Sequence, residues 1–150
     1  MRLFLTIAFG LFVGTSIAQD VSMDQGVDAF FMEDGFYDNI ADAKVTPTEV
    51  FYLDLSLQSP KLKSIPEEVY SFVNLKYLEI GFNQIGSISD DILKLTNLEV
   101  LGLSGNKYLT KMNEKIAEMP ALKEIHLKDT GLSADQLNGL KLPEGCKLVK

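Results

Sequence analysis

LKYLEIGFNQI occupies residues 75–85, and three other segments of the chain align with it position by position. All four segments carry an apolar residue at positions 1, 4 and 6, and their starts lie 25, 23 and 24 residues apart. The other three are VFYLDLSLQSP (50–60), LEVLGLSGNKY (98–108) and LKEIHLKDTGL (122–132). A register that recurs four times at this spacing predicts one supersecondary unit per repeat.

A second apolar pattern follows each segment, with gaps of three or four residues that suit a short helical or 3₁₀ return. Each repeat is therefore expected to form one strand and one return segment. Neither can bury its apolar side alone, so the repeats must stack. The apolar residues of the return segments are Ile65, Val69 and Phe72, then Ile88, Ile92 and Leu95, then Met112, Ile116 and Met119, then Leu137 and Leu140.

This pattern resembles the leucine-rich repeat family, whose L-x-x-L-x-L-x-x-N signature recurs every 20 to 29 residues. The resemblance covers roughly residues 37–150, with Asn83 and Asn106 at position 9 and with Gln58 and Thr130 replacing that Asn in the first and fourth repeats. It implies an α/β solenoid: a right-handed, curved stack with a parallel β-sheet on the concave face and short helical or 3₁₀ segments on the convex face. It also implies that the position-9 Asn is buried and bonds to the backbone.

The chain divides into five parts on this interpretation. Residues 1–18 form a signal peptide, residues 19–36 an acidic leader and residues 37–49 an N-terminal cap, for which Phe36, Ile40 and Ala43 suggest a helix across the first repeat. The acidic residues 19–35, with Phe30 and Phe31, are expected to form a disordered tail, with a contribution to the cap as the alternative. The four repeats are assigned to 50–74, 75–97, 98–121 and 122–140, and residues 141–150 form a C-terminal cap.

The first eighteen residues predict export. Arg2 precedes an apolar run, and Ser16 and Ala18 are small residues suitably placed for cleavage after Ala18. The run is shorter than the ~20 apolar residues of a spanning helix, so we expect removal of the segment rather than membrane anchoring. The mature protein is therefore expected to be secreted or periplasmic, with no membrane insertion.

Charge argues against nucleic acid as a partner. The 150 residues carry a formal net charge of -7, and removal of residues 1–18 would leave thirteen lysines, no arginine and twenty-one acids, or -8. Nucleic-acid binding depends on a basic face and often on the planar guanidinium fork. We therefore expect no nucleic-acid partner.

The sequence gives little support for catalysis. Its single cysteine, Cys146, lies between apolar Leu142 and Leu148 and is expected to pack as a small hydrophobe, with a reactive thiol as the alternative. The single histidine, His126, is expected to face solvent from a strand. One Cys and one His offer no metal-ligand spacing. We predict a non-enzymatic protein with no cofactor, no metal site and no catalytic residue.

The candidate binding surface is the outward face of the predicted sheet, because strand positions 3, 5 and 7 alternate away from the core. Its front half is aromatic and acidic, its middle small and its rear charged. Aromatic residues beside carboxylates suit a protein or peptide partner, or a sugar ring as an alternative. Exposed aromatics can also simply be good strand formers. The predicted partner-binding residues are Tyr52, Asp54, Tyr77, Glu79, Phe82 and His126.

Three functions remain open at this stage. The first is an exported scaffold that binds a protein or peptide through the concave sheet face, as the resemblance implies for extracellular bacterial members of the family. The second is a glycan-binding module that uses the same aromatic residues. The third is a structural subunit of an envelope assembly, docked through a cap or the acidic leader.

Overall fold

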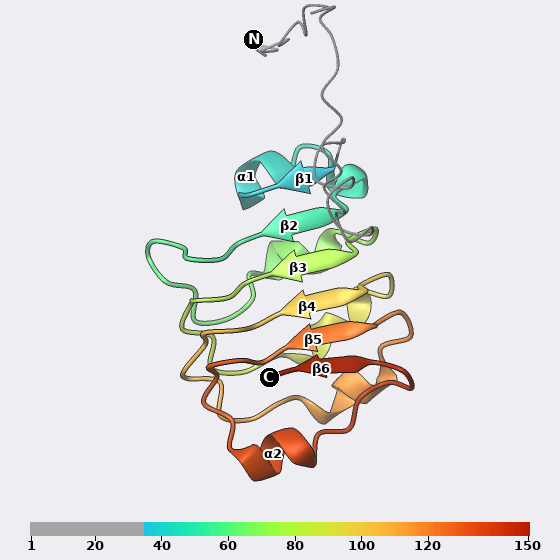
Figure 1. Ribbon diagram of the computed structural model, residues 1–150. Coiled ribbons are helices and arrows are strands. Elements are labelled where there is room, and N and C mark those ends of the chain that lie inside the picture. The colour runs from blue at the N-terminus through green and yellow to red at the C-terminus, as the bar shows by residue number, and fades with distance from the viewer. Residues whose placement is uncertain (1–34) are drawn as a thin grey trace, which may run out of the picture.

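The computed structural model describes residues 35–150, and within that range it forms a single open sheet of six parallel strands in chain order. The predicted signal peptide and nearly all of the acidic leader lie outside the described residues. Figure 1 shows the strands stacked one above the other from β1 to β6. They are β1 (Phe36–Tyr37), β2 (Tyr52–Asp54), β3 (Tyr77–Glu79), β4 (Val100–Gly102), β5 (Glu124–His126) and β6 (Lys147–Val149).

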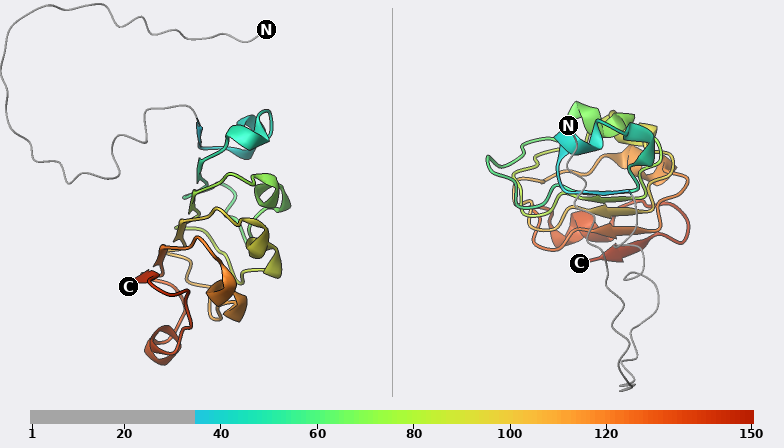
Figure 2. Two further views of the ribbon diagram at one scale, coloured as in Figure 1. Left: turned by 90° about the vertical axis from the view of Figure 1, so that its right-hand side faces the viewer. Right: turned by 90° about the horizontal axis from the view of Figure 1, so that it is seen from above.

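The return segments are short helices on the opposite side of the stack from the sheet. In the side view of Figure 2 the sheet lies along the inner curve and the helices along the outer curve. The predicted α/β solenoid, with its sheet on the concave face and helical or 3₁₀ turns on the convex face, is therefore confirmed. The helices are α1 (Ile40–Ala43), α2 (Ala134–Asn138) and the 3₁₀ turns η1 (Pro47–Glu49), η2 (Glu67–Ser71), η3 (Asp90–Lys94) and η4 (Glu114–Glu118).

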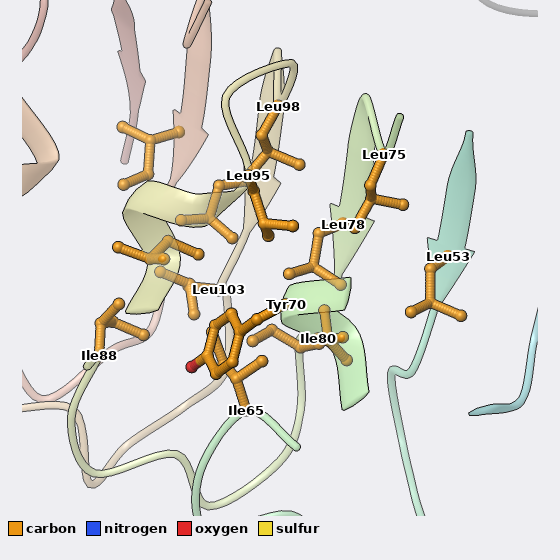
Figure 3. Close-up of a cluster of buried hydrophobic side chains, with 14 of the residues drawn as sticks. Leu53, Ile65, Tyr70, Leu75, Leu78, Ile80, Ile88, Leu95, Leu98 and Leu103 are labelled. Carbon is orange, nitrogen blue, oxygen red and sulfur yellow. The ribbon is translucent and has the colours of Figure 1, made fainter. Parts of the chain in front are cut away.

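The hydrophobic core fills the space between sheet and helices. Figure 3 shows Leu53 and Leu78 on the strands directed into the interior that Ile65 and Leu95 enter from the return segments. Every inward residue at strand positions 4 and 6 is at most 2% exposed, as the alternation predicted. Each such side chain contributes about 1.5–3 kcal/mol when fully buried. The eight residues are Leu53, Leu55, Leu78, Ile80, Leu101, Leu103, Ile125 and Leu127.

Asn83 and Asn106 anchor the turns that follow β3 and β4. The Asn106 side chain is fully buried; its amide donates to Ile80 O (3.1 Å) and Leu103 O (2.8 Å), and its Oδ1 accepts from Ile85 N (2.9 Å). Asn83 bonds in the same way to the preceding repeat and to its own turn. These side chains satisfy backbone groups that the turns would otherwise leave unpaired.

Thr130, at the equivalent position of the last repeat, keeps only part of this arrangement. Its hydroxyl donates to Leu127 O at 2.9 Å, within its own turn, and no side-chain bond to a neighbouring repeat is made. Gln58 in the first repeat reaches only Ser56 O, at 3.4 Å. The first and last turns therefore lack the side-chain bonds between repeats that Asn83 and Asn106 make.

The two ends of the stack carry strands that the four-repeat register did not contain. Phe36 was expected on a capping helix, but it lies in β1, and α1 begins only at Ile40. The reason is that parallel pairing with β2 places Phe36 beside Tyr52 and Tyr37 beside Leu53, continuing the outward and inward alternation. At the other end β6 pairs with β5, so Leu148 extends the inward row opposite Ile125.

Candidate functional site: the concave sheet face

The register of the strands places the predicted binding residues in adjacent columns. Tyr52 lies opposite Tyr77, and Asp54 lies opposite Glu79. On the next strand the same columns continue with Val100 and Gly102. The sheet therefore assembles the aromatic and acidic half of the predicted site from residues 25 positions apart in the sequence.

An aromatic ladder runs along the front of the concave face. The ring centroids of Phe36 and Tyr52 are 5.0 Å apart with an interplanar angle of 23°, and those of Tyr52 and Tyr77 are 5.8 Å apart at 28°. Offset stacking of this kind is worth about 0.5–1.5 kcal/mol per pair beyond the area buried. Phe36 remains 43% exposed at the end of the ladder. The three rings form a rigid apolar surface on an otherwise polar face.

Two carboxylates lie one column away from the ladder. Asp54 Oδ1 accepts a hydrogen bond from Ser56 N at 2.8 Å, and Glu79 Oε1 accepts one from Gly81 N at 2.9 Å. Within residues 35–150 no base forms an ion pair with either carboxylate. Negative charge on this part of the sheet is therefore held by backbone amides rather than neutralised by lysines.

The Glu79 carboxylate lies over Gly102 on the neighbouring strand. A Cβ built on Gly102 would overlap the Glu79 carboxyl group, so the glycine is required for this placement. Burial raises the pKa of the Glu79 carboxyl; the Gly81 N–H opposes that rise, Asp54 adds to it and His126 opposes it. Glu79 thus lies between the charges of β2 and β5, above a strand with no charged side chain of its own.

The rim beyond the strands carries two exposed apolar residues in strained backbone conformations. Leu57 and Phe82 both have a φ of 54° and are 66% and 54% exposed. At the same repeat position the third repeat has Gly105 (φ 76°) and the fourth Asp129 (φ 56°), residue types that tolerate this region better. For a bulky side chain the left-handed region costs about 1–2 kcal/mol. We call Leu57 and Phe82 the apolar rim.

His126 lies apart from the front half of the face. Its Nε2 is 2.8 Å from Glu124 Oε1, and Lys147 Nζ lies 3.7 Å from the same oxygen. This small cluster on β5 and β6 is internally compensated in charge. The structure therefore brings Tyr52, Asp54, Tyr77 and Glu79 together, with Phe82 at the rim, whereas His126 approaches the group only through its charge across Gly102.

Across residues 35–150 no group of three or more His, Cys, Asp or Glu side chains is placed to hold a metal ion. No helix in that same range is long and apolar enough to cross a membrane. Cys146 is partly buried against the core, and burial, followed by the charge of Glu124, raises the pKa of its thiol.

Sequence reasoning left three participating residues out of the predicted site. The sequence pattern predicts a capping helix at Phe36 and small side chains in the middle of the face, where Gly102 lies, and it assigns no binding role to Leu57. The left-handed backbone at Leu57 could have been predicted, because Gly105 occupies the same repeat position and glycine favours that conformation. Nothing in the sequence showed that Glu79 leans over Gly102.

Fold and surface together define a repeat solenoid with one exposed, curved sheet face. A family model described as leucine rich repeat matches residues 73–132. Among solved structures, an LRR protein of Leptospira interrogans aligns with a TM-score of 0.62 and 22% identity, covering 75% of this chain and 28% of that one. The chain belongs to the leucine-rich repeat proteins.

Two curated relatives share the repeats but are far larger. Asporin of Bos taurus is 30% identical over 102 residues, which are 67% of this chain and 25% of asporin. An adenylate cyclase of Schizosaccharomyces pombe is 30% identical over 97 residues, 65% of this chain and 5% of the cyclase. The second match covers only the repeat region. Leucine-rich repeat domains are typical protein-interaction scaffolds and are generally non-enzymatic.

Proposed function

We propose that this chain is an exported, non-enzymatic scaffold that binds a protein or peptide through its concave sheet face. The observation that carries the proposal is the aromatic ladder of Phe36, Tyr52 and Tyr77 beside the carboxylates of Asp54 and Glu79. Aromatic anchors on a rigid element are the residue types that dominate protein interfaces. A face of four repeats and two end strands suits an interface near the lower end of the ~1,200–2,000 Å² range.

The experiment is an affinity capture from the envelope and surroundings of the source organism. The mature protein is compared with a variant carrying Tyr52→Ala, Tyr77→Ala and Phe82→Ala. A matched control carries Val45→Ala, Val73→Ala and Tyr108→Ala, which remove exposed apolar side chains outside the strands. Circular dichroism first verifies that both variants are folded. We then expect a partner that the control retains and the concave-face variant loses. Equal capture by all three proteins would contradict the proposal.

A glycan is the second candidate, supported by the same exposed Phe36 at the end of the ladder, since aromatic rings also stack on sugars. Soluble oligosaccharides would then change the tyrosine fluorescence of the mature protein. If the protein binds peptides and not glycans, adding the oligosaccharides would leave this fluorescence unchanged.

Docking as a structural subunit predicts instead that deletion of residues 19–35 abolishes association. Export itself is tested by the amino-terminal sequence of the mature protein, expected to begin at Gln19.

A further inference from the structure

The middle of the concave face, at β4, carries the smallest side chains. Its outward residues Val100, Gly102 and Ser104 are small. The neighbouring strands carry larger outward side chains, Tyr77 and Glu79 on β3 and Glu124 and His126 on β5. The Glu79 carboxylate fills the space over Gly102, which is itself buried. A partner side chain that contacts the face here meets the Glu79 carboxylate, with Tyr77 on the same strand.

The charge of this part of the face selects the chemistry of that side chain. Asp54 and Glu79 lie on adjacent strands in direct register, and no base of residues 35–150 pairs with them. Like charges placed directly opposite one another destabilise a sheet unless a cation meets them. A guanidinium suits both the carboxylates and the aromatic rings of this face, because it binds carboxylates in a bidentate manner and stacks on aromatic faces.

The mature protein would supply no guanidinium of its own. The only arginine of the chain is Arg2, in the predicted signal peptide, so the mature protein would contain none. Leu57 and Phe82 follow Asp54 and Glu79 by three residues, beyond the ends of β2 and β3. Exposed apolar side chains this close in sequence to the two carboxylates suit a partner that carries an apolar side chain beside its cation.

We propose that the concave face docks an extended protein segment that presents an arginine next to an apolar residue. The guanidinium pairs with Glu79, Asp54 on the adjacent strand β2 adds to the negative charge that attracts it, and the apolar side chain contacts Leu57 and Phe82. This inference rests on the proposed function and specifies the chemistry of its partner. It assigns the front half of the face, and not the compensated Glu124, His126 and Lys147 cluster, as the determinant of specificity.

The test uses the mature protein and a nine-residue glycine and serine peptide that carries one Leu-Arg pair. The control peptide replaces the arginine by citrulline, which keeps its shape and removes its charge. In amide NMR spectra, we expect the arginine peptide to shift the signals of Gly81, whose N–H donates to Glu79, and of Gly102. We expect the citrulline peptide to bind at least five-fold more weakly, and added salt to weaken the arginine peptide selectively.

Matched variants locate the site. The double variant Asp54→Asn, Glu79→Gln should lose the distinction between the two peptides. The control Glu118→Gln, Asp135→Asn removes the same charge from convex-side helices and should retain it. Equal binding of both peptides by the wild-type protein, or retention of the preference by the concave double variant, would overturn the proposal.

Binding of the arginine peptide should release a proton from the protein. Because the pKa of Glu79 is raised, a bound cation favours its ionised form and releases a proton, so affinity for the arginine peptide should increase as pH rises through that pKa. The titratable groups facing Glu79 are Asp54 and Tyr52 on β2 and His126 on β5, and β4 contributes none.

The outcomes separate this inference from the proposed function. If no arginine preference is found but captured partner is lost by the variant carrying Tyr52→Ala, Tyr77→Ala and Phe82→Ala, only the chemistry of the partner is wrong. If the arginine preference is found but captured partner is unaffected by those substitutions, the peptide site exists and the proposed function is wrong.

Discussion

The carboxylate of Glu79 occupies the space that a side chain at position 102 would need. Gly102 lies directly opposite Glu79 in the β3 to β4 register, and a Cβ on the glycine would overlap the carboxyl group. A residue on one repeat therefore depends on the absence of a side chain on the next. This dependence links the shape of the concave face to its charge, and it can be tested independently of any partner.

Gly102→Ala should destabilise the protein by about 1–3 kcal/mol, since the added methyl forces Glu79 out of its position. Glu79→Ala should relieve part of that loss, because it removes the overlapping group. Urea unfolding of the two single variants and the double variant measures the coupling between them. Strictly additive effects would mean that the two residues do not interact.

Stability should depend on pH through Glu79. Its pKa is raised in the folded protein, so the native state binds this proton more tightly than the unfolded state. As pH falls through the folded pKa, the wild-type protein should gain stability relative to Glu79→Gln, and the gain is complete below the unfolded pKa. The difference between the two proteins isolates Glu79 from other carboxyls. A difference that does not vary with pH would refute the raised pKa.

Asn106→Ala should cost about 2–4 kcal/mol, because the buried N–H of Ile85 loses its acceptor and the carbonyls of Ile80 and Leu103 each lose one of their two donors. Asn97→Ala is the matched control: that amide donates to Val73 O at 2.8 Å in an exposed position, so we expect a loss below about 1 kcal/mol. Chemical denaturation of both variants checks the comparison. Similar losses would show that burial of Asn106 contributes nothing.

Leu57→Gly should leave stability unchanged or raise it by up to about 1 kcal/mol, because glycine relieves the left-handed strain while gaining freedom when unfolded. Val73 is also exposed but has no positive φ, so Val73→Gly should lower stability by about 0.5–1 kcal/mol. Thermal unfolding distinguishes the two. A larger loss for Leu57→Gly would show that its side chain serves the fold rather than a partner.

Native Cys146 should react slowly with iodoacetamide at neutral pH. Partial burial and the charge of Glu124 raise the pKa of the thiol, so little of the reactive thiolate is present. Unfolding in urea should accelerate the modification, which mass spectrometry follows directly. Rapid labelling of the folded protein would support the alternative of a reactive thiol.

The sequence predicted the solenoid well because repetition makes one pattern visible four times. Inward Leu78 and Leu101, and buried Asn83 and Asn106, are each specified by their place in the register. The ends were harder, because Phe36 and Tyr37 form a strand without a preceding repeat to set their register. Pairing with β2 decides their conformation, and that contact is not local in the sequence.

The candidate site was predicted in composition but not in shape. Alternation along the strands placed Tyr52, Tyr77, Asp54 and Glu79 on one face, which the pairing bears out as geometry. Side-chain direction could not be read from alternation, so the lean of Glu79 over Gly102 was missed. The positive φ of Leu57 and Phe82 was not predicted either, since leucine and phenylalanine rarely adopt this backbone conformation.

The most direct test of concave-face binding is crosslinking from defined positions. A photoreactive benzoylphenylalanine replaces Ser104, an outward residue after β4, or Glu118, an exposed residue of η4 on the convex side. Both proteins are irradiated with captured partner after their folding is verified. Crosslinks from position 104 and none from position 118 are the expected result. Crosslinks from position 118 alone, or equally from both, would contradict recognition by the concave face.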